Sequence, residues 1–215
     1  MAESRYIAIE GPIGVGKTSL ARRLAEVLDS ELVLEESGTN PFLERFYNDP
    51  RGAALPTQLF FLFQRVRQLE QLRQADMFSD VRVSDFLIDK DRLFAQTTLD
   101  RHELLLYEKI YETLDFDPPA PHLVVYLQAP VDTLLFRIAR RGIAYEREIG
   151  RRYLERLAEA YSRFFHDYDG SPLLIVNAET IDPINNELHF RMLLDEIQSP
   201  RGGRRFFNPV ASALA

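Results

Sequence analysis

The chain has 215 residues and a formal net charge of −7, because 33 Asp and Glu outnumber 26 Lys and Arg. This length predicts one domain with elaborations, since domains usually run to about 150 residues. The chain has no cysteine, which excludes a disulfide framework, a thiolate zinc site, an iron–sulfur cluster and a cysteine nucleophile. The four histidines are too scattered to suggest a metal motif.

Charge and hydropathy also limit the partners that we expect. A net negative protein repels nucleic acid and anionic lipid, so we expect neither as a partner. No apolar stretch approaches the roughly 18 residues of a membrane span, and the first six residues do not resemble a signal peptide. We therefore expect a soluble, cytoplasmic protein.

Apolar segments of strand length alternate with longer segments at helical spacing. This alternation predicts an α/β fold with a central five-stranded parallel sheet flanked by helices. The expected strands are 5–10, 31–35, 81–85, 122–127 and 173–177. The expected helices lie near 17–29, 55–76, 89–114, 131–141, 150–168 and 183–197. Residues 1–198 then form the domain, and the Gly- and Arg-containing segment 199–215 is expected to be a flexible tail.

A glycine-rich loop follows the first expected strand. Its sequence G-P-I-G-V-G-K-T matches the phosphate-binding pattern G-x-x-x-x-G-K-[ST] and leads into a helix. Backbone N–H groups of such a loop converge on phosphate oxygens, and the helix N-terminus adds its positive end. Lys17 would reach the β and γ phosphates, and the Thr18 hydroxyl would bind Mg²⁺. The expected ATP-binding residues are Gly11, Pro12, Ile13, Gly14, Val15, Gly16, Lys17, Thr18 and Ser19.

One acidic residue is placed to complete a metal site with this loop. Asp85 ends the third expected strand, where its carboxylate would hold Mg²⁺ against Thr18. The alternative is that Asp85 only caps the helix that begins near Asp89. The sequence has no N-K-x-D motif, so nothing in it indicates a GTPase.

Two polar residues stand in the middle of the apolar face of the helix over 55–76. Gln58 and Arg65 lie about 20° apart on a helical wheel, surrounded by leucine and phenylalanine. An unpaired polar group there costs several kcal/mol, so both need partners. Either a structural hydrogen bond or ion pair satisfies them, or they bind a polar ligand inside the core. Phe60 and Phe63 point toward the polar side, which indicates a second buried face such as a dimer contact.

Two further groups of charged residues are candidates. Glu35 and Glu36 close the second expected strand, and ligands bind at the carboxyl ends of parallel strands. Arg137 and Arg141 share a helix face just before Gly142, where they would neutralise a transferring phosphoryl group. Arginines near a helix C-terminus are also favoured by the helix dipole, so this pattern alone leaves both readings open.

Together these residues resemble the deoxynucleoside kinase family, which includes deoxycytidine and deoxyguanosine kinases and bacterial deoxyadenosine/deoxyguanosine kinases. The resemblance covers roughly residues 5–197 and follows the chain in order. It rests on the P-loop, on the run N-P-F-L-E-R-F-Y at 40–47, on the spacing of Gln58 and Arg65, on D-R-L-F-A at 91–95, and on the lid-like segment 137–146 with R-Y-L at 152–154.

The resemblance implies a P-loop kinase fold with a short lid, and a homodimer. It implies transfer of phosphate from Mg²⁺-ATP to the 5′-hydroxyl of a deoxynucleoside in nucleotide salvage. By the same resemblance, Lys17, Arg137 and Arg141 supply positive charge and Glu35 is the base beside the 5′-hydroxyl. The implied substrate-binding residues are Glu35, Tyr47, Gln58, Arg65, Asp91 and Glu146, with Tyr47 and Glu146 at the 3′-hydroxyl and the Gln, Arg and Asp at the base.

An Arg–Asp pair presents hydrogen-bond donors and acceptors together. Arg65 and Asp91 therefore suit guanine, adenine or cytosine better than thymine. The resemblance implies a purine deoxynucleoside, deoxyadenosine or deoxyguanosine, with deoxycytidine as a further candidate. The nearest alternative function is a nucleoside monophosphate kinase. The more distant one is a non-catalytic module that binds ATP through its P-loop.

The chain departs from the family pattern at two places. Many relatives have Glu-Pro after the second strand, whereas this chain has Glu35-Glu36, so Glu36 remains a rival for the base. The animal enzymes carry an arginine after the acidic residue that corresponds to Asp85, and this chain has Phe86 there. Arg92 is the expected substitute for that arginine.

Overall fold

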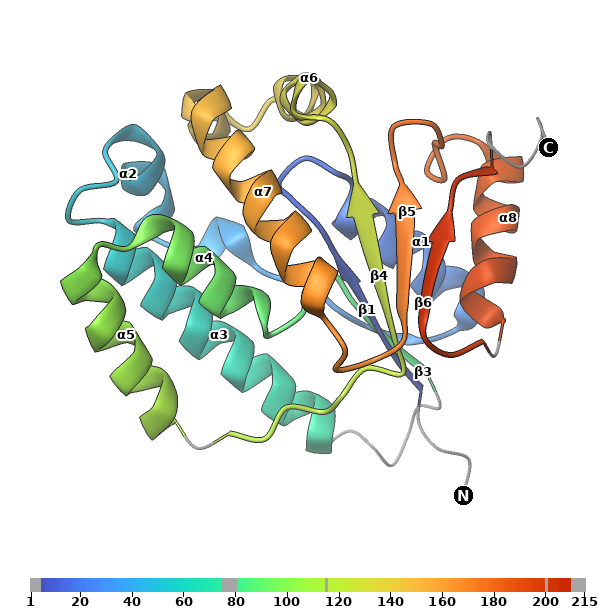
Figure 1. Cartoon of the computed structure of the whole chain (residues 1–215), viewed down its shortest axis with the longest axis horizontal. Coiled ribbons are helices and arrows are strands. Elements are labelled where there is room, and N and C mark those ends of the chain that lie inside the picture. Colours follow the sequence, from blue (N-terminus) through green and yellow to red (C-terminus); the bar gives the residue numbers. More distant parts are fainter. Residues whose placement is uncertain (1–4, 75–80, 115, 200, 210–215) are drawn as a thin grey trace.

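In the computed structural model, residues 5–74, 81–114, 116–199 and 201–209 are described. They form one six-stranded sheet with the order β2-β3-β1-β4-β5-β6, and every pair of neighbouring strands is parallel. The strands are β1 (Arg5–Glu10), β2 (Glu31–Val33), β3 (Val81–Ser84), β4 (Leu123–Gln128), β5 (Leu173–Asn177) and β6 (Arg204–Phe207). Figure 1 shows the sheet with helices on both sides, as the alternating pattern predicts.

The helices connect successive strands and cover both faces of the sheet. They are α1 (Lys17–Leu28), α2 (Leu43–Asn48), α3 (Ala54–Gln74), α4 (Lys90–Thr98), α5 (Arg101–Thr113), α6 (Val131–Arg141), α7 (Arg151–Asp167) and α8 (Glu187–Gln198). Two 3₁₀ helices, η1 (Ser37–Thr39) and η2 (Ala144–Glu148), lie in the loops. Among the described residues, no helix combines the length and the apolar character needed to cross a bilayer.

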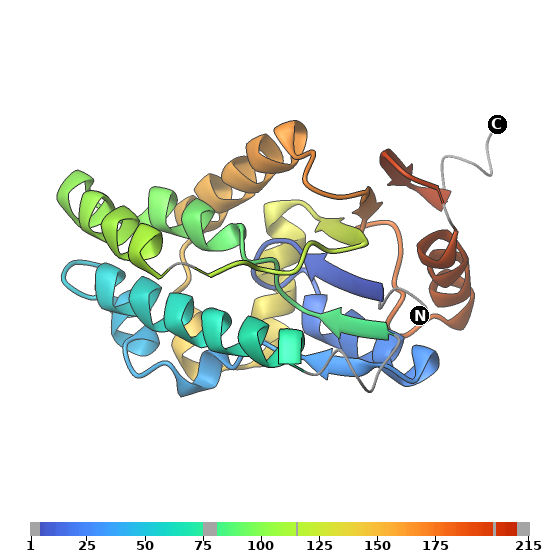
Figure 2. The same cartoon turned by 90° about the horizontal axis from the view of Figure 1, so that it is seen from below.

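The core has two layers because alternate residues of each strand face opposite sides. In β1, Ile7 and Ile9 pack with α1 and α8, whereas Tyr6 and Ala8 pack with α4 and α7. Figures 1 and 2 show α7 on the opposite side of the strands from α1 and α8, with α3, α4 and α5 grouped at one end.

The expected helix over 89–114 is two helices. The Asp100 side chain accepts hydrogen bonds from the backbone N–H groups of His102 and Glu103, and the Glu103 side chain accepts the Asp100 backbone N–H. This capping box starts α5 and ends the continuity with α4. The pattern D-x-x-E at 100–103 was available in the sequence as a helix start. The last two residues of the expected helix over 55–76 lie outside the described residues.

The prediction of five strands is wrong, because the sheet has six. The sixth strand, β6, lies in the segment expected to be a tail and pairs with β5 from Leu173–Arg204 to Val176–Phe207. Phe207 is buried against the α8 side of the core, whereas Phe206 is 75% exposed. A four-residue edge strand with two arginines and one buried side chain has no clear period of its own, so the alternation did not reveal it.

Candidate active site

The P-loop joins β1 to α1 and lies tightly against β4 and α6. Gly11 has φ of 148°, and a Cβ atom there would lie 2.5 Å from the Leu127 carbonyl oxygen. A Cβ at Gly14, where φ is 83°, would lie 2.9 Å from the Leu134 carbonyl oxygen. The loop therefore requires glycine at both places. The Lys17 ammonium donates to the Gly11 carbonyl at 2.7 Å, so this hydrogen bond joins the two ends of the loop.

A cavity of about 610 Å³ lies against this loop. Its wall is formed by the P-loop and the first turn of α1, by one side of α6, and by the segment 178–185 after β5. The Arg137 guanidinium donates to the Val15 carbonyl at 3.0 Å and to the Ala178 carbonyl at 2.7 Å. Arg137 thus ties α6 to the P-loop from within the wall of the cavity.

Thr18, in the first turn of α1, and Asp85, directly after β3, are in contact next to the P-loop. The Thr18 hydroxyl donates to Asp85 Oδ2, and Asp85 Oδ1 accepts the Glu35 backbone N–H at 2.7 Å. Asp85 does not cap α4, because Asp89 occupies the N-cap position. The hydroxyl and carboxylate oxygens are hard donors of the kind that Mg²⁺ prefers. Among the described residues no group of three or more His, Cys, Asp or Glu could hold a metal. Two protein oxygens would leave the other positions around such an ion to phosphate and water oxygens.

Arg65 joins two carboxylates in the core beside β2. Its side chain is 3% exposed and forms ion pairs with Glu35 and with Asp91. Arg65 Nε donates to Glu35 Oε1 at 2.8 Å, and the Tyr107 hydroxyl donates to Asp91 Oδ1 at 2.7 Å. The partners that the wheel position of Arg65 requires are therefore present within the protein itself.

Gln58 lies two turns before Arg65 on α3 and is only partly satisfied. It is 2% exposed, and its amide nitrogen donates to the Thr98 hydroxyl at 3.3 Å. Its buried oxygen Oε1 has no hydrogen-bond partner among the described residues. A buried acceptor without a partner costs about 1–3 kcal/mol. Gln58 therefore offers an acceptor that a ligand with an N–H group would satisfy.

Glu35 is held as a carboxylate although its side chain is only 18% exposed. Burial alone would raise its pKa, but the positive charges of Arg65, Lys90 and Lys17 outweigh that effect and lower the pKa to about 2. Both Arg65 and Lys90 contact Oε1, and no described residue forms a hydrogen bond with Oε2. Glu36 is exposed at the start of η1. The geometry therefore favours Glu35 over Glu36 as the base.

Two buried charged residues of this region escaped the sequence reasoning. Lys90 Nζ lies 3.2 Å from Glu35 Oε1 and 3.7 Å from Glu10 Oε2. Glu10 ends β1 directly before the P-loop and is completely buried. The only sequence signals were an acidic residue at the end of an apolar strand and a lysine next to Asp91, and neither pattern is specific.

The lid side of the site contains Tyr47, Arg141 and Glu146. Glu146 in η2 is 6% exposed and accepts both Nε–H, at 3.0 Å, and an amino group of Arg141. The Tyr47 ring stacks on Tyr145 at a centroid distance of 6.1 Å. Burial, followed by the nearby Tyr153 and Glu146, raises the pKa of Tyr47, so its hydroxyl remains a donor. The structure thus brings Tyr47 and Glu146 together, as the resemblance implies.

Arg92 is not brought to the site. Its guanidinium donates to Glu108 at 3.0 and 2.6 Å and lies over the Tyr111 ring at 4.7 Å. Successive residues of a helix point about 100° apart, so Arg92 turns outward when Asp91 faces Arg65. The expectation that Arg92 substitutes for the arginine missing after Asp85 is therefore not supported by its position.

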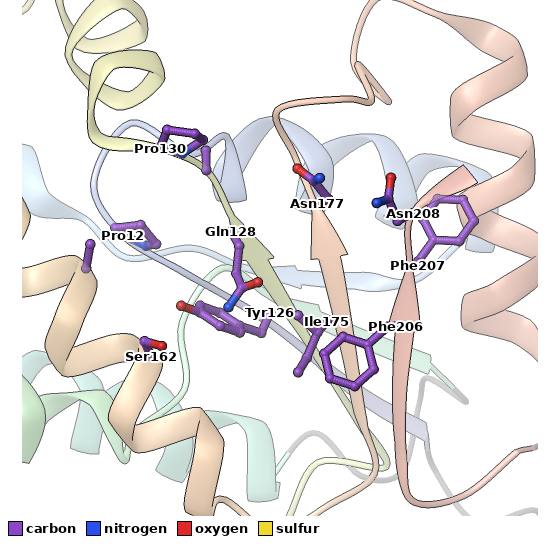
Figure 3. A pocket seen from close by; sticks show the side chains of 12 residues that line it. Pro12, Tyr126, Gln128, Pro130, Ser162, Ile175, Asn177, Phe206, Phe207 and Asn208 are labelled. Atoms are coloured by element: carbon purple, nitrogen blue, oxygen red, sulfur yellow. The ribbon is translucent and has the colours of Figure 1, made fainter. Parts of the chain in front are cut away.

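A second hollow, of about 480 Å³, lies on the other side of the P-loop (Figure 3). Gln128 and Asn177 stand at the ends of β4 and β5, Phe206 comes from β6, and Ser162 faces them from α7. None of the residues that line it is charged. The cavity against the P-loop is instead lined by charged groups suited to phosphate chemistry, among them Lys17, Arg137 and Arg141.

The P-loop carries its lysine and threonine, and it lies beside arginines from an adjoining helix and a partly buried carboxylate. This combination defines a P-loop phosphotransferase. The family model "Deoxynucleoside kinase" matches residues 7–200. The chain belongs to the deoxynucleoside kinase family and is an ATP-dependent phosphotransferase. This confirms the resemblance and excludes the non-catalytic alternative.

Named relatives agree with this assignment. The chain is 38% identical to a Bacillus subtilis deoxyguanosine kinase over 164 residues, which cover 75% of this chain and 78% of the relative. It is 29% identical to a deoxyadenosine/deoxycytidine kinase of the same organism over 205 residues, with coverage of 92% and 93%. The solved structure of an M. mycoides deoxyadenosine kinase with dCMP and a flexible dCDP bound superposes with a TM-score of 0.79 at 25% identity, covering 89% of this chain and 98% of the other.

Proposed function

We propose that this enzyme transfers the γ-phosphoryl group of ATP to the 5′-hydroxyl of a purine deoxynucleoside, deoxyadenosine or deoxyguanosine, with deoxycytidine as a further candidate. One observation carries the proposal: the unpartnered Oε1 of Gln58 shares a buried helix face with Arg65, next to Glu35. Amino and N–H groups of a base would satisfy that oxygen. The named relatives act on deoxyguanosine, deoxyadenosine and deoxycytidine, which supports the same substrate class.

The Arg65–Asp91 pair would read the other part of the base edge. A guanidinium donates only and a carboxylate accepts only, so the pair suits a base edge with both kinds of group. Adenine, guanine and cytosine have such edges and each carries an amino group, which thymine lacks. Because Tyr107 and Glu35 also hold the pair, its geometry is fixed before substrate binds.

Glu35 would act at the reacting hydroxyl, with Oε2 as the accepting oxygen. The substrate 5′-oxygen forms a bond to the γ-phosphorus, the bond from that phosphorus to the β–γ bridging oxygen breaks, and ADP leaves with the electron pair. The hydroxyl proton passes to Glu35. A carboxylate with a pKa of about 2 is a weak base, so it accepts this proton late and contributes mainly by orienting the hydroxyl. Tyr47 and Glu146 would hold the 3′-hydroxyl.

Positive charge would come from Lys17 and from the lid arginines Arg137 and Arg141. Thr18 and Asp85 would hold Mg²⁺ together with the triphosphate, and the ion would neutralise charge on the phosphate oxygens. Arg137 already touches the P-loop carbonyl of Val15, which supports a place beside the triphosphate. Phosphoryl transfer depends mainly on such alignment and neutralisation.

We also propose a cytoplasmic homodimer that serves nucleotide salvage. Adjacent helices α3 and α5 carry exposed apolar side chains, namely Phe63 at 46%, Leu105 at 56% and Leu106 at 49%. An apolar surface of this kind is typical of an interface. Light scattering of the purified protein should give a mass of about twice that of the chain, and a monomeric mass at micromolar concentration would contradict the dimer.

The function is tested by offering Mg²⁺-ATP with each deoxynucleoside and ribonucleoside in turn and identifying the product. We expect the 5′-monophosphates of deoxyadenosine or deoxyguanosine to form fastest and thymidine to react slowest. Formation of diphosphate from a monophosphate acceptor, with no reaction of nucleosides, would instead favour a nucleoside monophosphate kinase.

A further inference from the structure

Lys90 is buried between two carboxylates at the start of α4. Its side chain is 3% exposed, and Nζ lies 3.2 Å from Glu35 Oε1 and 3.7 Å from Glu10 Oε2. The Phe86 ring lies below the ammonium at 5.9 Å. Burying an ammonium costs several kcal/mol unless such partners surround it. The two carboxylates provide this compensation.

Lysine is rare in this chain, and two of its lysines lie close together beside Glu35. The sequence contains three lysines, Lys17, Lys90 and Lys109, among its 26 basic residues. Lys109 is exposed, whereas Lys17 and Lys90 are close enough that, after burial, the charge of Lys90 is the largest influence lowering the pKa of Lys17. A lysine presents a compact, strongly hydrated charge on a flexible stem, which fits a narrow gap between carboxylates better than the wide fork of an arginine.

Glu10 fixes the other side of Lys90. Its Oε1 accepts the Gly11 backbone N–H at 2.8 Å and the Tyr161 hydroxyl at 2.9 Å, and its Oε2 accepts the Leu87 backbone N–H at 2.8 Å. Three donors from three elements hold this carboxylate. The position of Lys90 is therefore set by Glu10, the last residue of β1 before the P-loop.

We propose that Lys90 is a positioning residue for Glu35: with Arg65 it binds Oε1, leaves Oε2 to the substrate hydroxyl, and ties the carboxylate to the P-loop through Glu10. This inference rests on the proposed role of Glu35. Lys90 then takes over the role of the arginine that the animal enzymes carry after the residue corresponding to Asp85. Arg92 does not do so, because its side chain points away from Glu35. The link aligns the two substrates, because Glu35 faces the acceptor and the P-loop holds the donor.

The substitution Lys90→Met tests the proposal, with Lys109→Met as a matched control that removes the same charge from an exposed position. For Lys90→Met we expect kcat to fall by at least about 10-fold, with KM for ATP changed by less than about 3-fold. Lys90→Arg should recover part of the lost kcat, and Lys109→Met should behave as the unaltered enzyme. A kcat for Lys90→Met within about 2-fold of the control would overturn the proposal.

A double-mutant cycle separates this inference from the proposed function. Because Lys90 acts through Glu35, adding Lys90→Met to Glu35→Gln should lower kcat by no more than about 2-fold, whereas independent effects would multiply. Independent effects would contradict the proposal. A fully active Glu35→Gln enzyme would contradict the proposed base. A slow Glu35→Gln enzyme with normal Lys90→Met turnover would contradict only the role of Lys90.

If Lys90→Met does not give a folded protein, Glu10→Gln provides the same test. The amide keeps most of the shape, removes the charge opposite Lys90, and replaces one of the two oxygens that accept the Gly11 and Leu87 N–H groups. It should lower kcat with little change in KM for ATP, and unchanged kcat would overturn the proposed link to the P-loop.

Discussion

Replacing Gln58 by methionine should raise the stability of the free enzyme while weakening its binding of substrate. The buried Oε1 of Gln58 has no partner, and an unsatisfied buried acceptor costs about 1–3 kcal/mol. Methionine fills a similar volume without that acceptor, although it gives up the long 3.3 Å bond to Thr98. We therefore expect an unchanged or higher free energy of unfolding, by up to about 2 kcal/mol.

The same change removes the acceptor that the base would use. The loss of one such hydrogen bond, worth about 1–3 kcal/mol, corresponds to a rise of about 5- to 150-fold in KM for the deoxynucleoside. Urea denaturation and initial-rate kinetics measure the two quantities on one preparation. Thr57→Val is the control, because the Thr57 hydroxyl is also buried without a partner on the same helix and has no proposed role in binding. A less stable Gln58→Met protein with an unchanged KM would refute the reasoning, since it would make Gln58 a structural residue.

Three further predictions follow from the described contacts. The pKa of Glu35 is about 2 in the folded chain against 4.5 for an ordinary glutamate, so its stabilising effect is complete above pH 4.5 and is lost as the pH falls toward 2. The pKa difference corresponds to about 3 kcal/mol of folding stability. The free energy of unfolding, measured as the pH is lowered, should therefore fall less steeply for Glu35→Gln than for the unaltered chain. Asp91→Asn should change the ratio of kcat/KM between deoxyadenosine and deoxyguanosine, and an unaltered ratio would leave the residue a purely structural role. Gly11→Ala should lower kcat/KM for ATP by more than about 10-fold, because its Cβ would lie 2.5 Å from the Leu127 carbonyl oxygen, whereas Gly150→Ala, with open space around it, should not.

Most of the fold was readable from the sequence because parallel strands buried on both faces have near-continuous apolar runs. The five strands from β1 to β5 fall close to their expected positions. The edge strand β6 was missed, since an edge strand with one buried side chain gives no clear period. The break between α4 and α5 was missed although the Asp100 capping box was visible, because the apolar pattern continues across it.

The candidate site was predictable where its residues follow sheet topology or interrupt an apolar pattern. Glu35 and Asp85 follow the carboxyl ends of the neighbouring parallel strands β2 and β3, so they had to meet at one edge of the sheet. Arg65 stood out because it interrupts an apolar helix face. Lys90 gave no such signal, because its contacts are with residues 55 and 80 positions away in the sequence. Only the folded chain shows that Lys90, rather than Arg92, lies against Glu35.

The most direct test of the account is the turnover of Glu35→Gln with Mg²⁺-ATP and a saturating purine deoxynucleoside, with ATP binding measured separately by titration. The glutamine keeps the size of the side chain but cannot accept the hydroxyl proton. We expect kcat to fall by about 10²- to 10⁴-fold while the Kd for ATP stays within a few-fold of its normal value. Near-normal turnover in that variant would contradict the account, because the hydroxyl would then react without Glu35.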